Sequence, residues 1–281
     1  MADAETPLFF DLSHLRKVLV AGPDAGKWLN DLTSADIGSL VPGEAGRSLL
    51  LSPTGRVRAE FTVAATGEGY LLMQDPEQRP IDQLLSPYTL SSDVSLADRT
   101  EALALFAILA STEPPPIEGV LASTPSWTGR GGDICGPAEL RDQMDDWLAA
   151  HLPRGSAEEL ERLRIASGRS RLGSEATEED LPEEAGMGDA VAFDKGCYLG
   201  QEAVAKVRNL GHPRRLIMAF EASKAVVRGE GLTVEGRDAG LVTSVATVGN
   251  TSLLLARVKW DERAGPFRTS GGASLKPRRE P

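Results

Sequence analysis

The sequence predicts an α+β fold followed by a small antiparallel β-barrel. Its first 210 residues alternate strand-like and helix-like patterns, whereas the residues after 215 form short apolar runs separated by glycine. A chain of 281 residues also favours two or three domains over a single one. We therefore expect a mixed region over residues 1–210, a barrel over residues 211–262 and a mobile tail over residues 263–281.

The mixed region begins with a strand at Lys17 to Val20, and Pro23 then favours the start of a helix. Two strand-like runs, Arg47 to Leu51 and Val57 to Ala65, flank the turn sequence Ser52-Pro53-Thr54-Gly55 and predict a hairpin. The remaining elements of this region are strands over Tyr70 to Gln74 and Glu101 to Ala110, and helices over Pro76 to Leu85, from Pro137 and after Ser156.

The C-terminal part has the pattern of an antiparallel barrel. Short alternating runs are separated by turn residues, which is typical of hairpin-connected strands. The residues after Glu262 are rich in Gly, Pro and Arg and have few apolar anchors, so we expect them to be mobile. The four predicted strands are Leu216 to Phe220, Gly231 to Glu235, Gly240 to Thr247 and Leu253 to Val258.

Charge and hydropathy argue against several classes of partner. The chain has 30 basic and 41 acidic residues and a formal net charge of −11, whereas nucleic-acid binding by counterion release needs a concentrated basic face. No apolar run approaches the roughly 18 to 20 residues that span a bilayer. The first seven residues carry no apolar targeting segment. We therefore expect a cytoplasmic protein with no membrane partner and no direct nucleic-acid partner; nothing in the sequence indicates an oligomeric state.

The cysteines and histidines do not form a metal site by spacing. The chain has two cysteines, Cys135 and Cys197, and three histidines, none of them in a short ligand motif. A disulfide between the two cysteines is not expected in a reducing cytoplasm. Each cysteine is therefore interpreted separately, and Cys135 is expected in the core.

Cys197 lies between two glycines, just before a helix predicted over Gln201 to Asn209. A cysteine at a helix N-terminus, with Lys195 two residues away, favours the thiolate form. The alternative is that Cys197 is a small buried apolar side chain at the start of the helix, as free cysteines commonly are. Physical reasoning alone leaves both interpretations open.

The octapeptide Lys195-Gly196-Cys197-Tyr198-Leu199-Gly200-Gln201-Glu202 resembles the K-G-C-Y-x-G-Q-E motif of the YgfZ family, a branch of the glycine-cleavage T-protein superfamily. Further segments resemble superfamily patterns in the expected order, from about Phe10 to Trp260. These segments are Asp11-Leu12-Ser13, Gly22-Pro23-Asp24-Ala25, the L-R-I-x-x-G element Leu163-Arg164-Ile165-Ala166-Ser167-Gly168, Pro182 and Glu184 of a P-x-E step, Phe193, and the G-x-V-T-S strand Gly240-Leu241-Val242-Thr243-Ser244.

The resemblance implies a T-protein-like ring of two interleaved α/β subdomains plus a C-terminal antiparallel β-barrel, with tetrahydrofolate or a derivative at its centre. It also implies a role in assembly or repair of iron–sulfur clusters, and indirectly in tRNA modification, with iron–sulfur proteins or assembly factors as partners. The family's essential cysteine corresponds to Cys197. The residues that we expect to contact folate are Glu60, Arg164, Lys195, Tyr198 and Gln201.

Each of these contacts has a structural alternative. Lys195 has the character of a solvated surface lysine, and Tyr198 is equally suited to packing against the start of the helix. Gln201 and Glu202 are also well placed to satisfy backbone N–H groups in the first helical turn.

The sequence departs from the aminomethyltransferases of the same superfamily at two positions. Their motif has an aspartate pair after a glycine turn, where this chain has Ala59 and Glu60. Their R-x-E-x-G element has a glutamate that holds the pterin, where this chain has Ala166. We therefore expect the chain not to be a conventional aminomethyltransferase, and keep folate-dependent aminomethyl transfer as the alternative function.

Overall fold

The computed structural model describes residues 7–109, 115–123, 131–222, 224–249 and 251–278. The chain forms two compact units. The first consists of Met1–Leu49 and Ala59–Ala157, and the second of Leu50–Arg58 and Glu158–Pro281. The longer stretch of the second unit begins at Glu158, some fifty residues before the expected boundary at residue 210. Its shorter stretch, Leu50–Arg58, contains the turn between the two strands of the predicted hairpin.

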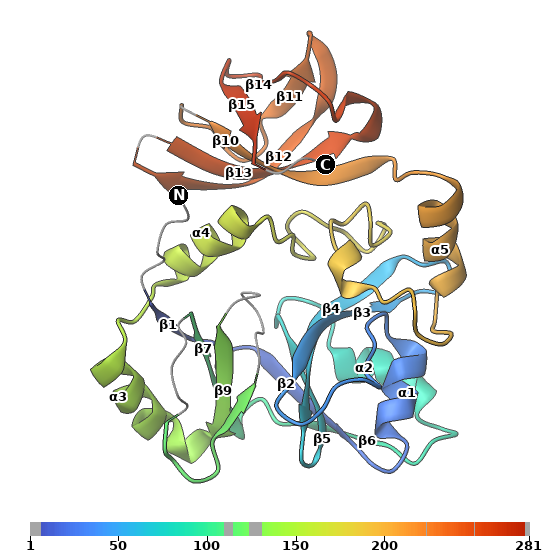
Figure 1. Ribbon diagram of the computed structural model, residues 1–281, viewed down its shortest axis with the longest axis vertical. Coiled ribbons are helices and arrows are strands. Elements are labelled where there is room, and N and C mark those ends of the chain that lie inside the picture. Colours follow the sequence, from blue (N-terminus) through green and yellow to red (C-terminus); the bar gives the residue numbers. More distant parts are fainter. Residues whose placement is uncertain (1–6, 110–114, 124–130, 223, 250, 279–281) are drawn as a thin grey trace. The chain divides into compact units, whose positions relative to one another are not determined.

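The first unit contains two sheets, with strand orders β3-β4-β5-β2-β6 and β1-β7-β9-β8 (Figure 1). The ends of β3 and β4 nearest their connecting turn belong to the second unit. The strands are β1 (Phe9–Asp11), β2 (Arg16–Ala21), β3 (Ala45–Leu51), β4 (Val57–Thr66), β5 (Gly69–Gln74), β6 (Ser95–Asp98), β7 (Leu103–Ile108), β8 (Leu121–Ser123) and β9 (Gly132–Pro137).

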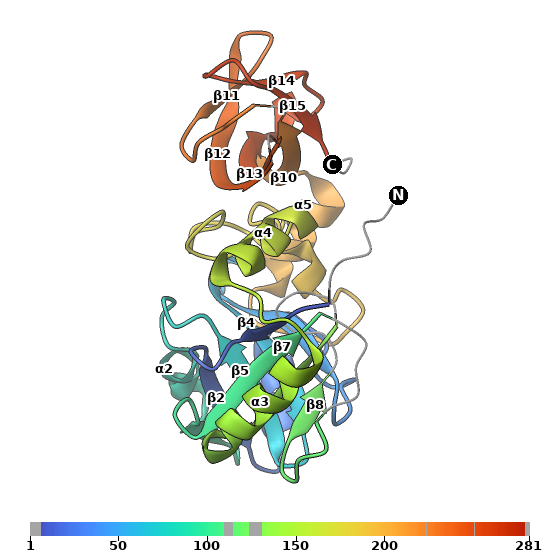
Figure 2. The same cartoon turned by 90° about the vertical axis from the view of Figure 1, so that its left-hand side faces the viewer.

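Three helices pack on these sheets because each has an apolar side. Helix α1 (Ala25–Leu32) buries Trp28 and Leu29. Helix α3 (Arg141–His151) lies on the four-stranded sheet (Figure 2), where Met144 and Leu148 are fully buried. The third helix is α2 (Ile81–Leu85), and short 3-10 turns occupy η1 (Ser86–Tyr88) and η2 (Ala138–Leu140).

The helix expected over Pro76 to Leu85 is shorter than predicted. Residues 76–80 form a turn instead, because the carboxylate of Asp75 accepts the backbone N–H of Glu77 at 2.9 Å. Pro80 then precedes the first residue of α2. The strand expected over Glu101 to Ala110 is β7; its last predicted residue, Ala110, lies outside the described residues.

The second unit contains a closed barrel of order β10-β13-β12-β11-β14-β15, as the barrel prediction requires. Its interior is apolar, with Phe220, Leu254 and Val258 fully buried. No helix in the described ranges is both long and apolar enough to cross a bilayer. The elements of this unit are α4 (Ala157–Ser167), η3 (Gly188–Ala190), α5 (Gln201–Leu210), β10 (Arg215–Ala222), β11 (Gly231–Val234), β12 (Arg237–Val248), β13 (Thr251–Lys259), η4 (Trp260–Glu262), β14 (Phe267–Thr269) and β15 (Ser274–Pro277).

The prediction of a mobile tail after residue 262 is wrong for most of its length. Strands β14 and β15 pair with each other, and β15 also pairs with β10, so this segment closes the barrel. Phe267 and Leu275 are the apolar anchors, and both contribute to the barrel core. Two anchors are sufficient because each strand is only three or four residues long.

A β-bulge in β12 determines which way Ser244 points. The pairing of β12 with β13 shifts between Val242 and Ser244, so Thr243 is the extra residue. Val242 and Val245 both pack against the barrel core. In a regular strand residues 242 and 244 would share a face; the bulge instead directs Ser244 away from the interior.

Ser244 is one of the partners of Arg164, a buried residue of α4. The guanidinium donates to both carboxylate oxygens of Glu161, at 2.7 and 2.8 Å. It also donates to Glu175 at 2.7 Å, to the carbonyl of Arg169 at 2.6 Å and to Ser244 at 3.0 Å. The Ser244 hydroxyl donates in turn to Glu175. All five N–H groups of the arginine therefore have an acceptor.

The charges in this network stabilise one another. Burial alone lowers the pKa of Arg164, but the hydrogen bonds that it donates to Glu161 and the charge of Glu175 outweigh burial and raise the pKa. The hydrogen bond from Arg164 lowers the pKa of Glu161. Breaking such a buried pair leaves an uncompensated charge, which destabilises proteins far more than the pair itself stabilises them.

We predict that Arg164→Gln lowers the free energy of unfolding by about 3–5 kcal/mol at neutral pH, because Glu175 is left buried without a cation. Arg162→Gln is the matched control, since among the described residues the half-buried Arg162 guanidinium makes no hydrogen bond or salt bridge. The control should change stability by about 0.5 kcal/mol or less. Urea unfolding of the full chain measures both, and equal losses in the two variants would contradict the network's role.

The stability difference between wild type and Arg164→Gln should also depend on pH. The folded-state pKa of Glu161 lies below its ordinary value of 4.5, so the stability from its pair with Arg164 is complete above that value. It is lost as the pH falls through the lower, folded-state pKa. The difference in the free energy of unfolding between wild type and Arg164→Gln should therefore decrease at acidic pH.

Candidate functional site around Cys197

The segment from Lys195 to Glu202 belongs to the second unit and runs from the residues after η3 into α5 (Figure 1). The helix begins at Gln201, with Gly200 as its N-cap residue. Cys197 lies four residues before the helix and is exposed. The expectation that Cys197 sits at the helix N-terminus is therefore corrected: the field of the free N–H groups is concentrated within the first turn, which Cys197 precedes. It is also not the small buried side chain of the alternative interpretation.

The side chain next to Cys197 is buried. Only 6% of Tyr198 is exposed, and among the described residues its hydroxyl has no hydrogen-bond partner. Burial raises the pKa of this phenol, so it is a neutral donor at physiological pH. The ammonium of Lys195 lies 5.0 Å from the centre of the Tyr198 ring, within the range of a cation–π contact. A buried, unpartnered hydroxyl beside a cation is a polar feature that a ligand can satisfy.

Gly200 allows this segment to pack closely against the turn between β3 and β4. Its φ angle is +82°, and a Cβ at this position would lie 2.4 Å from the carbonyl oxygen of Ser52. Gly55 in that turn has a φ angle of +77°, and a Cβ there would lie 2.8 Å from the side chain of Ala203. Gly200 is therefore required for the close contact between two backbones.

Two further contacts fix the surroundings of the octapeptide. The guanidinium of Arg208, in the last turn of α5, lies 3.7 Å from the centre of the Phe193 ring. The backbone N–H of Gln201 donates to the carbonyl of Tyr198 at 3.2 Å. Cys197 is thus an exposed thiol in a segment whose flanking residues are held on both sides.

Glu60, the carboxylate that remains of the aspartate pair, lies in the first unit and is almost completely buried. Its Oε1 accepts from Nε of Arg47 at 2.9 Å and forms a salt bridge with Nη2 at 2.7 Å. Only 6% of the Arg47 side chain and 2% of the Glu60 side chain are exposed. Glu60 is therefore engaged by a neighbouring arginine that sequence reasoning did not identify.

The five predicted folate contacts separate into two groups. Lys195, Tyr198 and Gln201 lie together in the octapeptide. Glu60 is paired with Arg47, and every guanidinium N–H of Arg164 is used within the second unit. For Glu60 and Arg164 the geometry supports a structural role.

No group of three or more His, Cys, Asp or Glu side chains in the described part of the chain has the geometry of a metal site. Cys135, expected in the core, is only partly buried and lines a cavity of the first unit. Burial nevertheless raises its pKa to about 11, so it is a neutral thiol at physiological pH.

Comparison with known proteins agrees with the architecture. Residues 4–110 match the GCVT N-terminal domain. The chain superposes on the glycine cleavage system aminomethyltransferase T from Bartonella henselae with a TM-score of 0.83 and 18% identity, over 96% of this chain and 84% of that one. The chain has a GcvT-like fold.

Sequence similarity extends over most of the chain. It is 27% identical to an aminomethyltransferase from Rubrobacter xylanophilus, over 84% of this chain and 71% of the relative. It is 26% identical to a putative chloroplastic transferase from Arabidopsis thaliana, where the match covers 83% of this chain but only 60% of the relative. Together with the domain match and the fold, these similarities support a relation of this chain to the GcvT-like superfamily.

The packing of Gly200 gives a direct prediction. Gly200→Ala should lower the free energy of unfolding by at least about 1–2 kcal/mol, because alanine resists a positive φ and its Cβ meets a backbone carbonyl that cannot rotate away. Gly196→Ala is the control within the same octapeptide, since a Cβ there meets no heavy atom within 4 Å and its φ is not positive. Urea unfolding of both variants measures the two stability losses, and a loss of similar size in Gly196→Ala would contradict the packing role of Gly200.

Proposed function

We propose that the chain is a tetrahydrofolate-binding accessory protein that supports assembly or repair of iron–sulfur clusters, and through them tRNA modification, by means of the Cys197 thiol. The observation that carries the proposal is the exposure of Cys197 in a segment that Gly200 anchors by close backbone packing. An exposed thiol on a held loop is accessible to another macromolecule, whereas a cysteine retained for packing would be buried.

Three residues of the octapeptide fit a folate. Tetrahydrofolate combines a pterin with a polar edge and a tail that ends in carboxylates. The buried hydroxyl of Tyr198 and the amide of Gln201 supply hydrogen-bonding groups, and Lys195 supplies a positive charge for a carboxylate. Glu60 and Arg164 enter the proposal as residues that stabilise the fold around these contacts.

A single thiolate cannot hold an iron–sulfur cluster, because protein-bound clusters usually have four protein ligands. In the proposal the cluster is cargo, and a partner protein supplies the other ligands. Cys197 then acts as one transient ligand or as a thiol that reacts at the client.

The second candidate function is folate-dependent aminomethyl transfer, which the names of the similar proteins favour. The state of Glu60 weighs against it, since a carboxylate paired with a buried arginine is poorly suited to act on a folate nitrogen. Turnover of an aminomethyl donor with tetrahydrofolate, abolished in Glu60→Ala, would favour this candidate. Absence of turnover in a protein that binds folate would eliminate it.

The proposal predicts that Cys197→Ser fails to restore iron–sulfur enzyme activity in a strain that lacks the protein, because serine cannot act as a thiolate ligand or nucleophile. The control is Lys206→Gln, an exposed position on α5 outside the octapeptide, which should restore activity fully. Thermal unfolding of both variants should match wild type. Full rescue by a folded Cys197→Ser protein would eliminate the thiol role and leave folate binding to be tested separately.

A further inference from the structure

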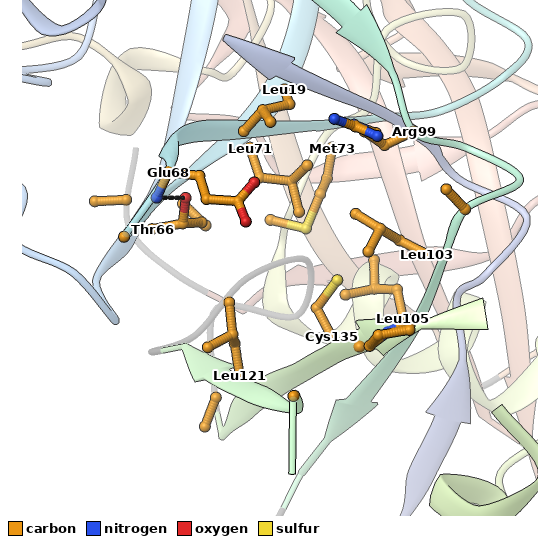
Figure 3. A pocket seen from close by; sticks show the side chains of 18 of the residues that line it. Leu19, Thr66, Glu68, Leu71, Met73, Arg99, Leu103, Leu105, Leu121 and Cys135 are labelled. Atoms are coloured by element: carbon orange, nitrogen blue, oxygen red, sulfur yellow. Dashed lines mark hydrogen bonds between the residues drawn. The ribbon is translucent and has the colours of Figure 1, made fainter. Parts of the chain in front are cut away.

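The first unit contains a cavity of about 670 Å³ to which both of its sheets contribute (Figure 3). Strands β2, β4 and β5 supply one wall, and β7, β8 and β9 supply the other. The volume falls within the range of roughly 300 to 1,000 Å³ that is typical of small-molecule sites. None of its lining residues belongs to the octapeptide around Cys197.

Most of the lining is apolar. Leu71, Met73 and Leu103 point into the cavity from opposite walls, as Figure 3 shows. Leu121, also in the lining, is 56% exposed and adds apolar surface at the rim. The Cys135 thiol adds a neutral, polarisable surface. An apolar body is therefore the part of a ligand that this cavity fits best.

Arg99 is the single cation among the described residues that line the cavity. It follows β6, and its side chain is drawn at one edge of the cavity in Figure 3. Arg99 is exposed, and among the described residues its guanidinium has no hydrogen-bond or salt-bridge partner. Other arginines of the first unit do have acid partners, for example Arg47 with Glu60 and Arg141 with Asp11.

We propose that this cavity binds a small molecule with an apolar body and one carboxylate, with the carboxylate on Arg99. A planar guanidinium matches a carboxylate through two parallel hydrogen bonds, which gives orientation as well as affinity. The apolar body then lies over Leu71, Met73 and Leu103. The site is independent of the proposed folate and thiol functions.

Two acidic residues, Glu68 and Glu139, also belong to the described lining, and a ligand carboxylate is repelled by both. Glu68 lies at another edge of the cavity, with Leu71 and Met73 drawn between it and Arg99 (Figure 3). A carboxylate next to Glu68 would be repelled, whereas one next to Arg99 is attracted. The ligand therefore enters with its anionic group at the Arg99 edge, and a cationic amphiphile is the discriminating alternative.

Calorimetric titration of the full chain with decanoate below its micelle concentration tests the site. Decanoate should bind saturably and more tightly than decanol or decylammonium. Arg99→Gln should weaken decanoate binding by roughly three- to tenfold and leave decanol binding unchanged. Arg268→Gln, at an exposed position in the barrel, is the charge-matched control and should bind like wild type.

Cys135 provides a second readout from inside the cavity. In a Cys197→Ser background, decanoate should slow alkylation of Cys135, and this protection should weaken in Arg99→Gln. Failure of decanoate to saturate, equal binding in Arg99→Gln, or tighter binding of decylammonium would overturn the proposal. Binding that leaves Cys135 unprotected would place the ligand elsewhere and overturn it as well.

Discussion

The buried guanidinium of Arg164 holds the second unit together, because it connects three segments that are distant in sequence. Glu161 lies on the same helix, Glu175 in the following acid-rich loop, and Ser244 on a barrel strand. A charge can be buried only when it is paired and fully hydrogen-bonded, and Arg164 meets that condition with acceptors for all five of its N–H groups. The bulge at Thr243 completes the network by directing Ser244 out of the barrel.

The same unit presents the thiol. Gly200 packs against the carbonyl of Ser52, and Gly55 packs against Ala203, so the start of α5 and the β3–β4 turn are in backbone contact. The carboxylate of Glu184 also connects two segments, since it accepts hydrogen bonds from the backbone N–H groups of Leu181 and Arg214. Several segments that resemble superfamily motifs therefore have structural explanations in this unit. Cys197 does not: it is exposed, and no packing requirement explains it.

The sequence predicted the fold class and most of the strands, because alternation and turn residues are local signals. It failed for β14 and β15, which are too short and too rich in turn residues for alternation to be visible. Arg164 and Glu60 were expected to contact folate because their hydrogen-bond partners could not be identified from the sequence. Ser244 lies eighty residues from Arg164, and Arg47 meets Glu60 only through the pairing of neighbouring strands. The cavity beside Arg99 was not predicted, since six strands contribute to it and no one segment carries its pattern.

The proposed function requires that the chain binds tetrahydrofolate although its remaining carboxylate, Glu60, is paired with Arg47. Calorimetric titration of the wild-type protein with tetrahydrofolate under anaerobic conditions tests it most directly. We expect saturable binding with one site per chain. No detectable binding at millimolar tetrahydrofolate would contradict the proposed function and leave the chain as a scaffold that presents a thiol.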